Sequence, residues 1–513
     1  MELAHFKRLD HRLKWGLLIT SLAVLGIMIA QVLMESRFAQ WQVLRREYAA
    51  ILRAKAVDAG GRAAADKFEI KIDQNFLQGL NAVDRCVVCH AGVDDPRMAS
   101  EKQPFRTHSG SYMKDHPPEK YGCTVCHRGQ GRAIVSDEAK AVGHHWDYPI
   151  LPVNLTQSSC GLCHTAKEVA DRGGEKYASG KMLFEAKGCR ACHKLNGRGG
   201  SLGPALDNEG LRVRGQLPMA HVTGVHTLPQ WLAEHFENPQ KIVAESKMVP
   251  PQLSREENES LTAYMLSLQN RDLPKSYITA EKHQEYFKAV RPDPVSGEEL
   301  YAAFCAVCHD TGKFGRYDKF FGKFIPAVRG TSFVQTASPS YVDAMIRLGR
   351  PGTIMPAWGA AAGGLSEAEI VKLRTYFLSM PVDSADTLPG EILATVNNPN
   401  FTANGDVSHG SEIFAKHCAA CHAPMGGGRL GPSIVNPVFQ KNATDGFLYA
   451  TIAMGRRDTA MPAFLAPGHG GFTESDILDV IVFIRSLAEK NNAQPQSDAK
   501  SELPAKPKEK VHE

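Results

Sequence analysis

The sequence carries almost no excess charge of either sign, and it contains no long block of basic residues. Its 59 lysines and arginines stand against 55 aspartates and glutamates, which gives a formal net charge of +4. A protein that grips a phosphate backbone needs a concentrated positive surface, and no run of lysine and arginine interleaved with aromatic side chains is present. The composition therefore argues against nucleic acid as a partner.

The sequence also lacks any cysteine that could be spared for a disulfide bond, because all 12 cysteines belong to six Cys-x-x-Cys-His motifs. The motifs are Cys86/Cys89/His90, Cys123/Cys126/His127, Cys160/Cys163/His164, Cys189/Cys192/His193, Cys305/Cys308/His309 and Cys418/Cys421/His422. Two thiols at this spacing can form thioether bonds to one porphyrin while the adjacent histidine binds its iron, so the spacing is the attachment signature of c-type haem. A zinc site or a disulfide would not require the trailing histidine each time. The sequence therefore predicts six covalently attached haems c, with these six histidines as proximal iron ligands.

Long apolar runs are scarce as well, and the one that stands out covers residues 15–34 without a charge. A helix of that length can cross roughly 30 Å of hydrocarbon. A cleaved secretory signal is the alternative, but its apolar region runs about 7–15 residues, and no small-x-small cleavage site follows. Because c-type haem is attached outside the cytoplasmic membrane of bacteria, we expect a cytoplasmic N-terminus over residues 1–14. A single-pass anchor over 15–34 in the inner membrane would then leave the haem domains on the periplasmic side.

A stalk over residues 35–72 follows the apolar run. Its apolar residues recur at steps of three and four, which is typical of a helix; they are Phe38, Trp41, Leu44, Tyr48 and Ile51. This face could pack on the chain's own next domain or dock onto a neighbouring membrane subunit, and the sequence does not separate the two. Alternation at Phe68, Ile70 and Ile72 predicts one short strand.

Residues 73–170 hold the first three motifs at intervals of 37 residues, too close for each to own an ordinary core. We therefore expect a module with little regular structure in which the haems are themselves the core. Each iron needs a second axial ligand, and four histidines outside the motifs are candidates: His108, His116, His144 and His145. Met98 and Met113 are the alternatives, and the pairing of ligand with haem is left open.

The last three motifs lie in three helical repeats, at 174–272, 293–382 and 405–490, whose internal order is the same. A glycine and, four residues later, an aromatic residue open each repeat. Each repeat closes with a helix whose N-cap is Ser254, Ser366 or Thr473, followed three residues later by an acid. Between these helices come Gly203-Pro204, Ile325-Pro326 and Gly431-Pro432, and then a methionine shortly before a proline. Each repeat is expected to have its own core.

Residues 491–513 are expected to form a disordered tail.

The order within the three repeats resembles the class I cytochrome c fold. The resemblance implies a mainly α architecture, a proline loop that supports the proximal histidine, and a downstream methionine as distal ligand, here Met248, Met355 and Met461. Gly349 and Gly455 each precede the methionine by six residues, which supports the alignment of the last two repeats. In the first repeat Met248-Val249-Pro250 departs from Met-Pro, so His221 and His226 are alternatives there.

Residues 116–122 and 127–131 are similar to the multihaem subunits that accompany cytochrome bc-type or alternative quinol oxidoreductase complexes. That resemblance implies quinol-oxidising membrane subunits as partners, such as a cytochrome b or its equivalent and an iron–sulfur protein, and a soluble periplasmic electron acceptor. A single span cannot build a quinol site between transmembrane helices, so the partner must supply it.

The sequence therefore predicts a membrane-anchored electron carrier, in which bis-histidine haems accept electrons and histidine/methionine haems of higher potential pass them outward. The chain would be an electron-transfer subunit, with no catalytic residue of its own. The first alternative is a cytochrome c subunit of a terminal oxidase. The second is a multihaem reductase or peroxidase, which would need an iron with an open position.

Overall fold

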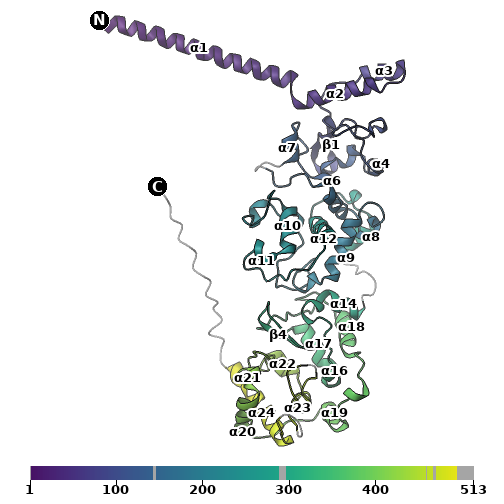
Figure 1. The fold of residues 1–513 in the computed structure, drawn as a ribbon, viewed down its shortest axis with the longest axis vertical. Helices are drawn as coiled ribbons and strands as arrows, with labels where there is room; N and C mark the ends of the chain where they lie inside the picture. The colour runs from purple at the N-terminus through teal and green to yellow at the C-terminus, as the bar shows by residue number, and fades with distance from the viewer. Residues whose placement is uncertain (1, 142–145, 288–295, 458, 466–469, 494–513) are drawn as a thin grey trace. The chain divides into compact units, whose positions relative to one another are not determined.

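The structure is a computed structural model, and it describes residues 2–141, 146–287, 296–457, 459–465 and 470–493 (Figure 1). The chain is mainly helical, as the sequence predicts, with two short two-stranded sheets among the described residues. It divides into two compact units. The first comprises Met1–Ala178, Gly210–Trp231 and Thr262–Tyr286, and the second comprises Ser179–Glu209, Leu232–Leu261 and Phe287–Glu513.

The N-terminal helix α1 (Glu2–Arg37) contains the whole apolar run. Its large apolar side chains between Phe6 and Met34 are exposed along the full length of the helix. Within the described part of the chain, one helical stretch is long and apolar enough to cross a membrane, and α1 supplies it (Figure 1). By length, composition and position near the N-terminus, this helix fits an anchor or a signal sequence.

The stalk folds back on its own domain through α2 (Gln40–Ala54) and α3 (Ala59–Asp66). Tyr48 and Leu52 of α2 are buried in a cluster with Ala65, Met98 and Phe105, whereas Phe38 at the start of the stripe is 71% exposed. The apolar face of the stalk is therefore mostly covered by this chain.

The strand predicted at residues 68–72 is wrong. Phe68 instead packs edge-on against the Tyr48 ring, with the ring centres 5.1 Å apart, and the buried Arg45 guanidinium lies 4.5 Å from the Phe68 ring centre. The strands come directly after, as an antiparallel hairpin of β1 (Asn75–Leu77) and β2 (Ala82–Asp84) in which Asn75 pairs with Asp84. Tertiary packing of one aromatic ring has outweighed a weak alternating pattern.

The module around the first three motifs has little regular structure, as predicted. Its α-helices are single turns: α4 (Tyr112–Asp115), α5 (Pro118–Tyr121), α6 (Thr124–His127), α7 (Ser136–Lys140) and α8 (Ala166–Val169). Short 3-10 helices, among them η2 (Cys86–Val88) and η4 (Val153–Leu162), carry the first and third motifs.

The three repeats combine helices of 8 to 20 residues with shorter turns. The first contains α9 (Glu175–Ala186), α10 (Leu228–Glu237), α11 (Pro239–Ile242) and α12 (Arg255–Ser267), with α13 (Ala280–Phe287) after it. The second contains α14 (Gly297–Phe304), α15 (Ala306–His309), β3 (Arg316–Asp318), β4 (Lys323–Ile325), α16 (Thr331–Thr336), α17 (Pro339–Leu348) and α18 (Glu367–Leu378), with α19 (Gly390–Asn397) after it. The third contains α20 (Val407–His417), α21 (Ala419–His422), α22 (Pro437–Asn442), α23 (Asp445–Met454) and α24 (Glu474–Ala493).

The predicted N-caps of the closing helices are confirmed. The hydroxyls of Ser254, Ser366 and Thr473 accept hydrogen bonds from the backbone three residues on. The acid at that position in turn accepts from the N-cap backbone in all three helices, at 2.7–2.9 Å. Helix α24 runs to Ala493, so the first three residues of the predicted disordered tail, 491–493, are helical, and the prediction is wrong there. Residues 494–513 lie outside the described residues.

The second and third repeats share one core, which corrects the expectation that each repeat has its own. A single buried cluster contains Leu300 and Trp358 of the second repeat together with Phe414 and Phe483 of the third. Equivalent residues, 106 positions apart, meet across the boundary. Tyr341 packs on Phe447, the Arg350 guanidinium lies 5.2 Å from the Phe439 ring centre, and Arg456 lies 5.8 Å from that of Phe333.

Candidate haem-binding sites

Each of the six motifs forms one helical turn. The backbone N–H of the histidine donates to the carbonyl of the first cysteine in every motif, at 2.9–3.0 Å; the pairs are His90–Cys86, His127–Cys123, His164–Cys160, His193–Cys189, His309–Cys305 and His422–Cys418. Residues three and four apart share a helix face, so the two thiols and the imidazole are presented together. All 12 cysteines are free, as thioether attachment requires.

The second cysteine of the last motif, Cys421, is placed by its backbone alone. Its N–H donates to the carbonyl of Cys418 at 3.1 Å, and its carbonyl accepts from the N–H of Gly431 at 2.9 Å, as Cys192 accepts from Gly203 at 2.8 Å in the first repeat. The Cys421 side chain is only partly buried, and the described part of the chain shows no hydrogen bond or ion pair to its Sγ. The thioether bond predicted at Cys421 follows from the motif spacing.

Proline carbonyls hold four of the proximal histidines. The Nδ1 atoms of His193, His309 and His422 lie 2.8 Å, 3.1 Å and 2.9 Å from the carbonyl oxygens of Pro204, Pro326 and Pro432. This is the support that the class I resemblance implies. Nδ1 of His90 has the same partner type, the carbonyl of Pro104 at 3.1 Å, which the sequence did not lead us to expect. A proton held on Nδ1 leaves Nε2 with its lone pair free for iron.

Burial lowers the pKa of all six proximal histidines, to about 4 for His309. The cause in each is desolvation, which penalises the charged imidazolium. The neutral ring that results is the form that binds a metal ion.

Glycines make room around the imidazoles and the methionine loops. A Cβ at Gly203 would lie 2.4 Å from Cε1 of His193, and one at Gly431 would lie 2.9 Å from Cε1 of His422. Gly349 and Gly455 have φ of +62° and +67°, and a Cβ at either would come within 2.5 Å of a proline carbonyl carbon in the Met-Pro loop. The six-residue spacing from glycine to methionine thus reflects close approach of two backbone segments.

The three methionine loops share a feature that the sequence-based alignment missed. The backbone N–H groups of Met248, Met355 and Met461 each donate to a hydroxyl two residues earlier, at 3.1–3.2 Å; the acceptors are Ser246, Thr353 and Thr459. The pattern Ser/Thr-x-Met was visible in all three repeats and would have aligned Met248 with the other two. The alternative His226 places Nε2 3.1 Å from the carbonyl of Val222, while His221 is exposed.

Two of the four candidate distal histidines face proximal histidines. The ring centre of His108 lies 6.1 Å from that of His127, and the ring centre of His116 lies 6.1 Å from that of His164. The ring planes are steeply inclined, at 71° and 79°. Nδ1 of His108 is engaged by the carbonyl of Ser109 at 2.7 Å, which leaves Nε2 for iron.

The remaining candidates are placed as follows. His144 and His145 lie outside the described residues. The pairs His108–His127 and His116–His164 leave His90 without an assigned distal ligand. The alternative Met98 is fully buried in the apolar cluster beneath Tyr48, and Met113 lies on α4 between His108 and His116.

The comparisons with known proteins match the repeats in order. Residues 177–269 match the family model described as cytochrome c. Residues 292–377 and 405–484 match the model described as cytochrome c oxidase, cbb3-type, subunit III. The chain is 33% identical over 90 residues to cytochrome c6 of Synechococcus elongatus, a stretch that covers 94% of that protein and 17% of this chain.

The chain is therefore a c-type cytochrome. More particularly, it contains several cytochrome c domains in its C-terminal part, and these domains with their Cys-x-x-Cys pairs imply covalent haem c.

Proposed function

We propose that this chain is a membrane-anchored hexahaem cytochrome that transfers electrons from quinol-oxidising membrane subunits to a soluble periplasmic acceptor. Haem c supplies a one-electron redox centre at each motif. The observation that carries the proposal is the pairing of His108 with His127 and of His116 with His164 in a module where three motifs crowd together. Two histidine ligands give a haem a low reduction potential, so electrons would enter the chain at this module.

The spacing of the two pairs would allow both histidines of each pair to bind one iron. Imidazole nitrogen bonds to a first-row metal ion such as zinc at about 2.0–2.1 Å, so two rings bound in line on opposite sides have centres about 6 Å apart. The observed 6.1 Å in both pairs agrees with this value. Ordinary edge-to-face packing would give a similar distance, but it would not select one proximal and one non-motif histidine in both pairs.

The haems of the three repeats have higher reduction potentials, and electrons leave the chain from them. Thioether ligation raises the potential of a haem relative to bis-imidazole ligation. The shared loop geometry supports Met248, Met355 and Met461 as the distal ligands. The histidine of each repeat has its Nδ1 fixed by a proline carbonyl. Electrons then move from the three-haem module toward the last two repeats.

A second function is favoured by one observation, the match of the last two repeats to the cbb3-type subunit III model. The chain would then serve a terminal oxidase instead of a quinol-oxidising complex. Mild detergent extraction and purification of the full chain discriminates the two. A cytochrome b and an iron–sulfur protein that co-purify support the first function, and a copper–haem oxidase supports the second.

The haem count is the first test of the proposal. A pyridine haemochrome assay on the full chain should return six haems per polypeptide. Fewer than about five would contradict the proposal, since every motif forms the same turn. Retention of α1 in the mature protein, measured by N-terminal sequencing, tests the anchor.

The ligand assignment is tested by redox titration. The full chain should show a low-potential group and a high-potential group. His108→Met and His116→Met should each raise the potential of one haem in the low group, and a different one in each variant. His11→Met, at an exposed histidine of α1 that is not a candidate ligand, is the control and should change neither group. A titration that remains unchanged in both variants would contradict the pairing.

A further inference from the structure

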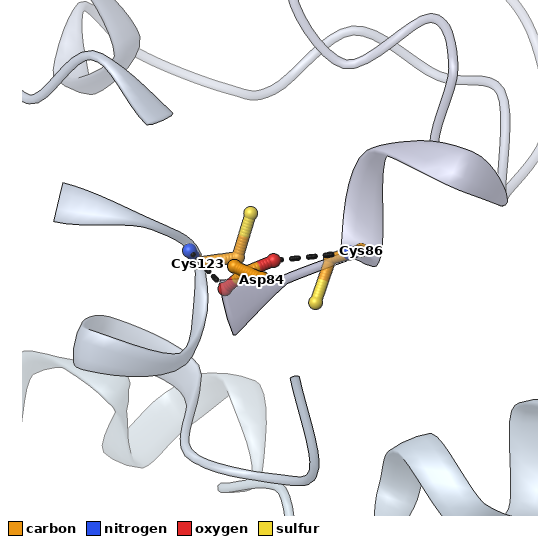
Figure 2. A group of neighbouring side chains, drawn as sticks. All are labelled: Asp84, Cys86 and Cys123. Carbon is orange, nitrogen blue, oxygen red and sulfur yellow. Dashed lines mark hydrogen bonds between the residues drawn. The ribbon is translucent and has the colours of Figure 1, made fainter. Parts of the chain in front are cut away.

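Asp84 stands between the attachment sites of the first two haems. It is the last residue of β2, and its side chain is completely buried. Oδ1 accepts a hydrogen bond from the backbone N–H of Cys86 at 3.0 Å. Oδ2 accepts from the backbone N–H groups of Cys123 at 2.8 Å and Thr124 at 3.0 Å, and from the Thr124 hydroxyl at 3.3 Å. Figure 2 shows the carboxylate between the two cysteines.

The hairpin that carries Asp84 is itself held by the second motif. Gly122, with φ of +66°, approaches so closely that a Cβ would lie 2.5 Å from Leu77 Cδ1 and 3.0 Å from Asp84 Oδ2. After the motif, the carbonyl of Gly131 accepts from the N–H of Arg85 at 2.7 Å. Residues just before and just after the second motif therefore contact the hairpin, and the Asp84 carboxylate is hydrogen-bonded to the backbone of both motifs.

This arrangement brings two thioether positions together. A carboxylate oxygen of Asp84 and the sulfurs of Cys86 and Cys123 all lie within 4.8 Å of one another. Each of these cysteines is the first of its motif, so each sulfur would carry the edge of a different porphyrin. Two porphyrins attached at these sulfurs would therefore have edges close to each other at this point.

We propose that Asp84 is a positioning residue that holds the first two haem attachment sites close together. Its buried negative charge also lowers the reduction potentials of both haems. The inference rests on the proposed attachment of haem at both motifs. An ionised carboxylate only accepts hydrogen bonds, as Asp84 does here. A charge in a low-dielectric site strongly shifts the reduction potential of a neighbouring haem. Asp84 would thereby make these two haems a closely coupled pair at the entry of the chain.

A metal ion held by Asp84, Cys86 and Cys123 is the competing explanation. Two features oppose it. Both carboxylate oxygens already accept hydrogen bonds from the backbone, and the two sulfurs belong to motifs whose histidine and second cysteine are arranged as in the other four. A zinc site of four ligands would also need a fourth donor.

The decisive variant is Asp84→Asn in the full chain, which removes the charge and keeps the shape. It should retain six haems, and the potentials of two haems in the low group should rise together. We expect a change of about tenfold in the one-electron equilibrium of each, equivalent to about 59 mV. The reduction potentials of the three high-potential haems should remain unchanged. Asp95→Asn is the matched control in the same module, because Asp95 also accepts hydrogen bonds but is paired with Arg97.

The outcomes are separable from those of the proposed function. Fewer than about five haems in the unmodified chain would contradict the function itself. Six haems together with a shift in Asp84→Asn no larger than in Asp95→Asn would overturn only the inference about Asp84. One equivalent of zinc in the unmodified chain that is lost in Asp84→Asn would overturn it in favour of the metal site.

A conservative variant covers the case in which Asp84→Asn fails to fold. Asp84→Glu keeps the charge and lengthens the side chain by one methylene. It should keep both haems in the low-potential group while the hydrogen bonds to Cys86 and Cys123 are strained. If Asp84→Glu attaches six haems but raises the two potentials by about tenfold in equilibrium constant, the charge is not the cause and the inference is wrong.

Discussion

The rings of Tyr341 and Phe447 pack with their centres 4.9 Å apart and their planes inclined by 31°, although the two residues hold equivalent positions in successive repeats. An arginine of each repeat also packs against a phenylalanine of the other repeat, Arg350 against Phe439 and Arg456 against Phe333. Arg456 also donates to the hydroxyl of Thr336 at 3.0 Å, and the carbonyl of Pro351 accepts from Asn436 at 2.8 Å. An interface in which equivalent residues meet in this way resembles the isologous contact of a homodimer, built here within one chain.

The first prediction is that these two repeats unfold as one unit. Phe447→Ala removes a ring buried at 5% exposure from the shared cluster and should cost about 3–5 kcal/mol. Hydrogen exchange followed by mass spectrometry should then show peptides of both repeats losing protection together. Tyr264→Ala, which empties a buried site in the first repeat, is the control and should leave the last two protected. Loss of protection confined to the third repeat after Phe447→Ala would show that the core is not shared.

The second prediction concerns Met461. Met461→His should keep its haem attached, because the thioethers and His422 are untouched, yet lower that haem's potential. Absorbance in the thioether-to-iron charge-transfer region should fall by about one third if three methionine-ligated haems contribute equally. Met425→His, at a methionine of the same repeat that is 55% exposed, is the control. An unchanged spectrum and an unchanged highest potential in Met461→His would assign this iron to another ligand.

The third prediction tests the glycine beneath the Met355 loop. In Gly349→Ala the new Cβ would lie 2.4 Å from the carbonyl carbon of Pro356, so the loop must shift and methionine ligation should weaken. Gly352→Ala has a similar φ, +78° against +62°, but its Cβ meets nothing within 4 Å. Both variants place an alanine at a positive φ, which is strained whatever space surrounds it. Only Gly349→Ala should lose part of the charge-transfer absorbance, and equal losses in both variants would rule out close approach as the cause.

The fourth prediction is a pH dependence in the last repeat. The hydrogen bond from His409 Nδ1 to Asp479 Oδ2, at 2.8 Å, raises the pKa of His409 above its ordinary value of 6.5. The protonated pair therefore stabilises the fold below pH 6.5, and this stabilisation is lost as the pH rises through the raised pKa. Because His409 is on the surface, the effect should be small and weaker in high salt.

Thermal unfolding of His409→Gln at two pH values checks this pair. The variant should melt below the unmodified chain at about pH 6, and the two should converge well above the histidine range, since neutral histidine gains little from the carboxylate. A difference that is the same at both pH values, or that does not shrink with added salt, would contradict an ionic contribution.

Much of each haem site could be foreseen because it is local. Two cysteines and a histidine within five residues fall on one helical turn whatever surrounds them, and the N-caps at Ser254, Ser366 and Thr473 depend on residues three positions apart. The methionine loops belong to this class too, since the Ser/Thr-x-Met bond spans two residues. Spacing along the chain is enough to specify contacts of this range.

Contacts between distant segments could not be foreseen in the same way. The sequence offered His108, His116 and others as distal ligands, but which proximal histidine each one faces depends on how a module with almost no helical period closes. Nothing near Asp84 marks it as the acceptor for a backbone 39 residues away, and no pattern within one repeat shows that Tyr341 meets Phe447. Local spacing specified the groups that can bind haem, whereas chain closure over long loops set their pairing, because that closure depends on the summed packing of the whole unit.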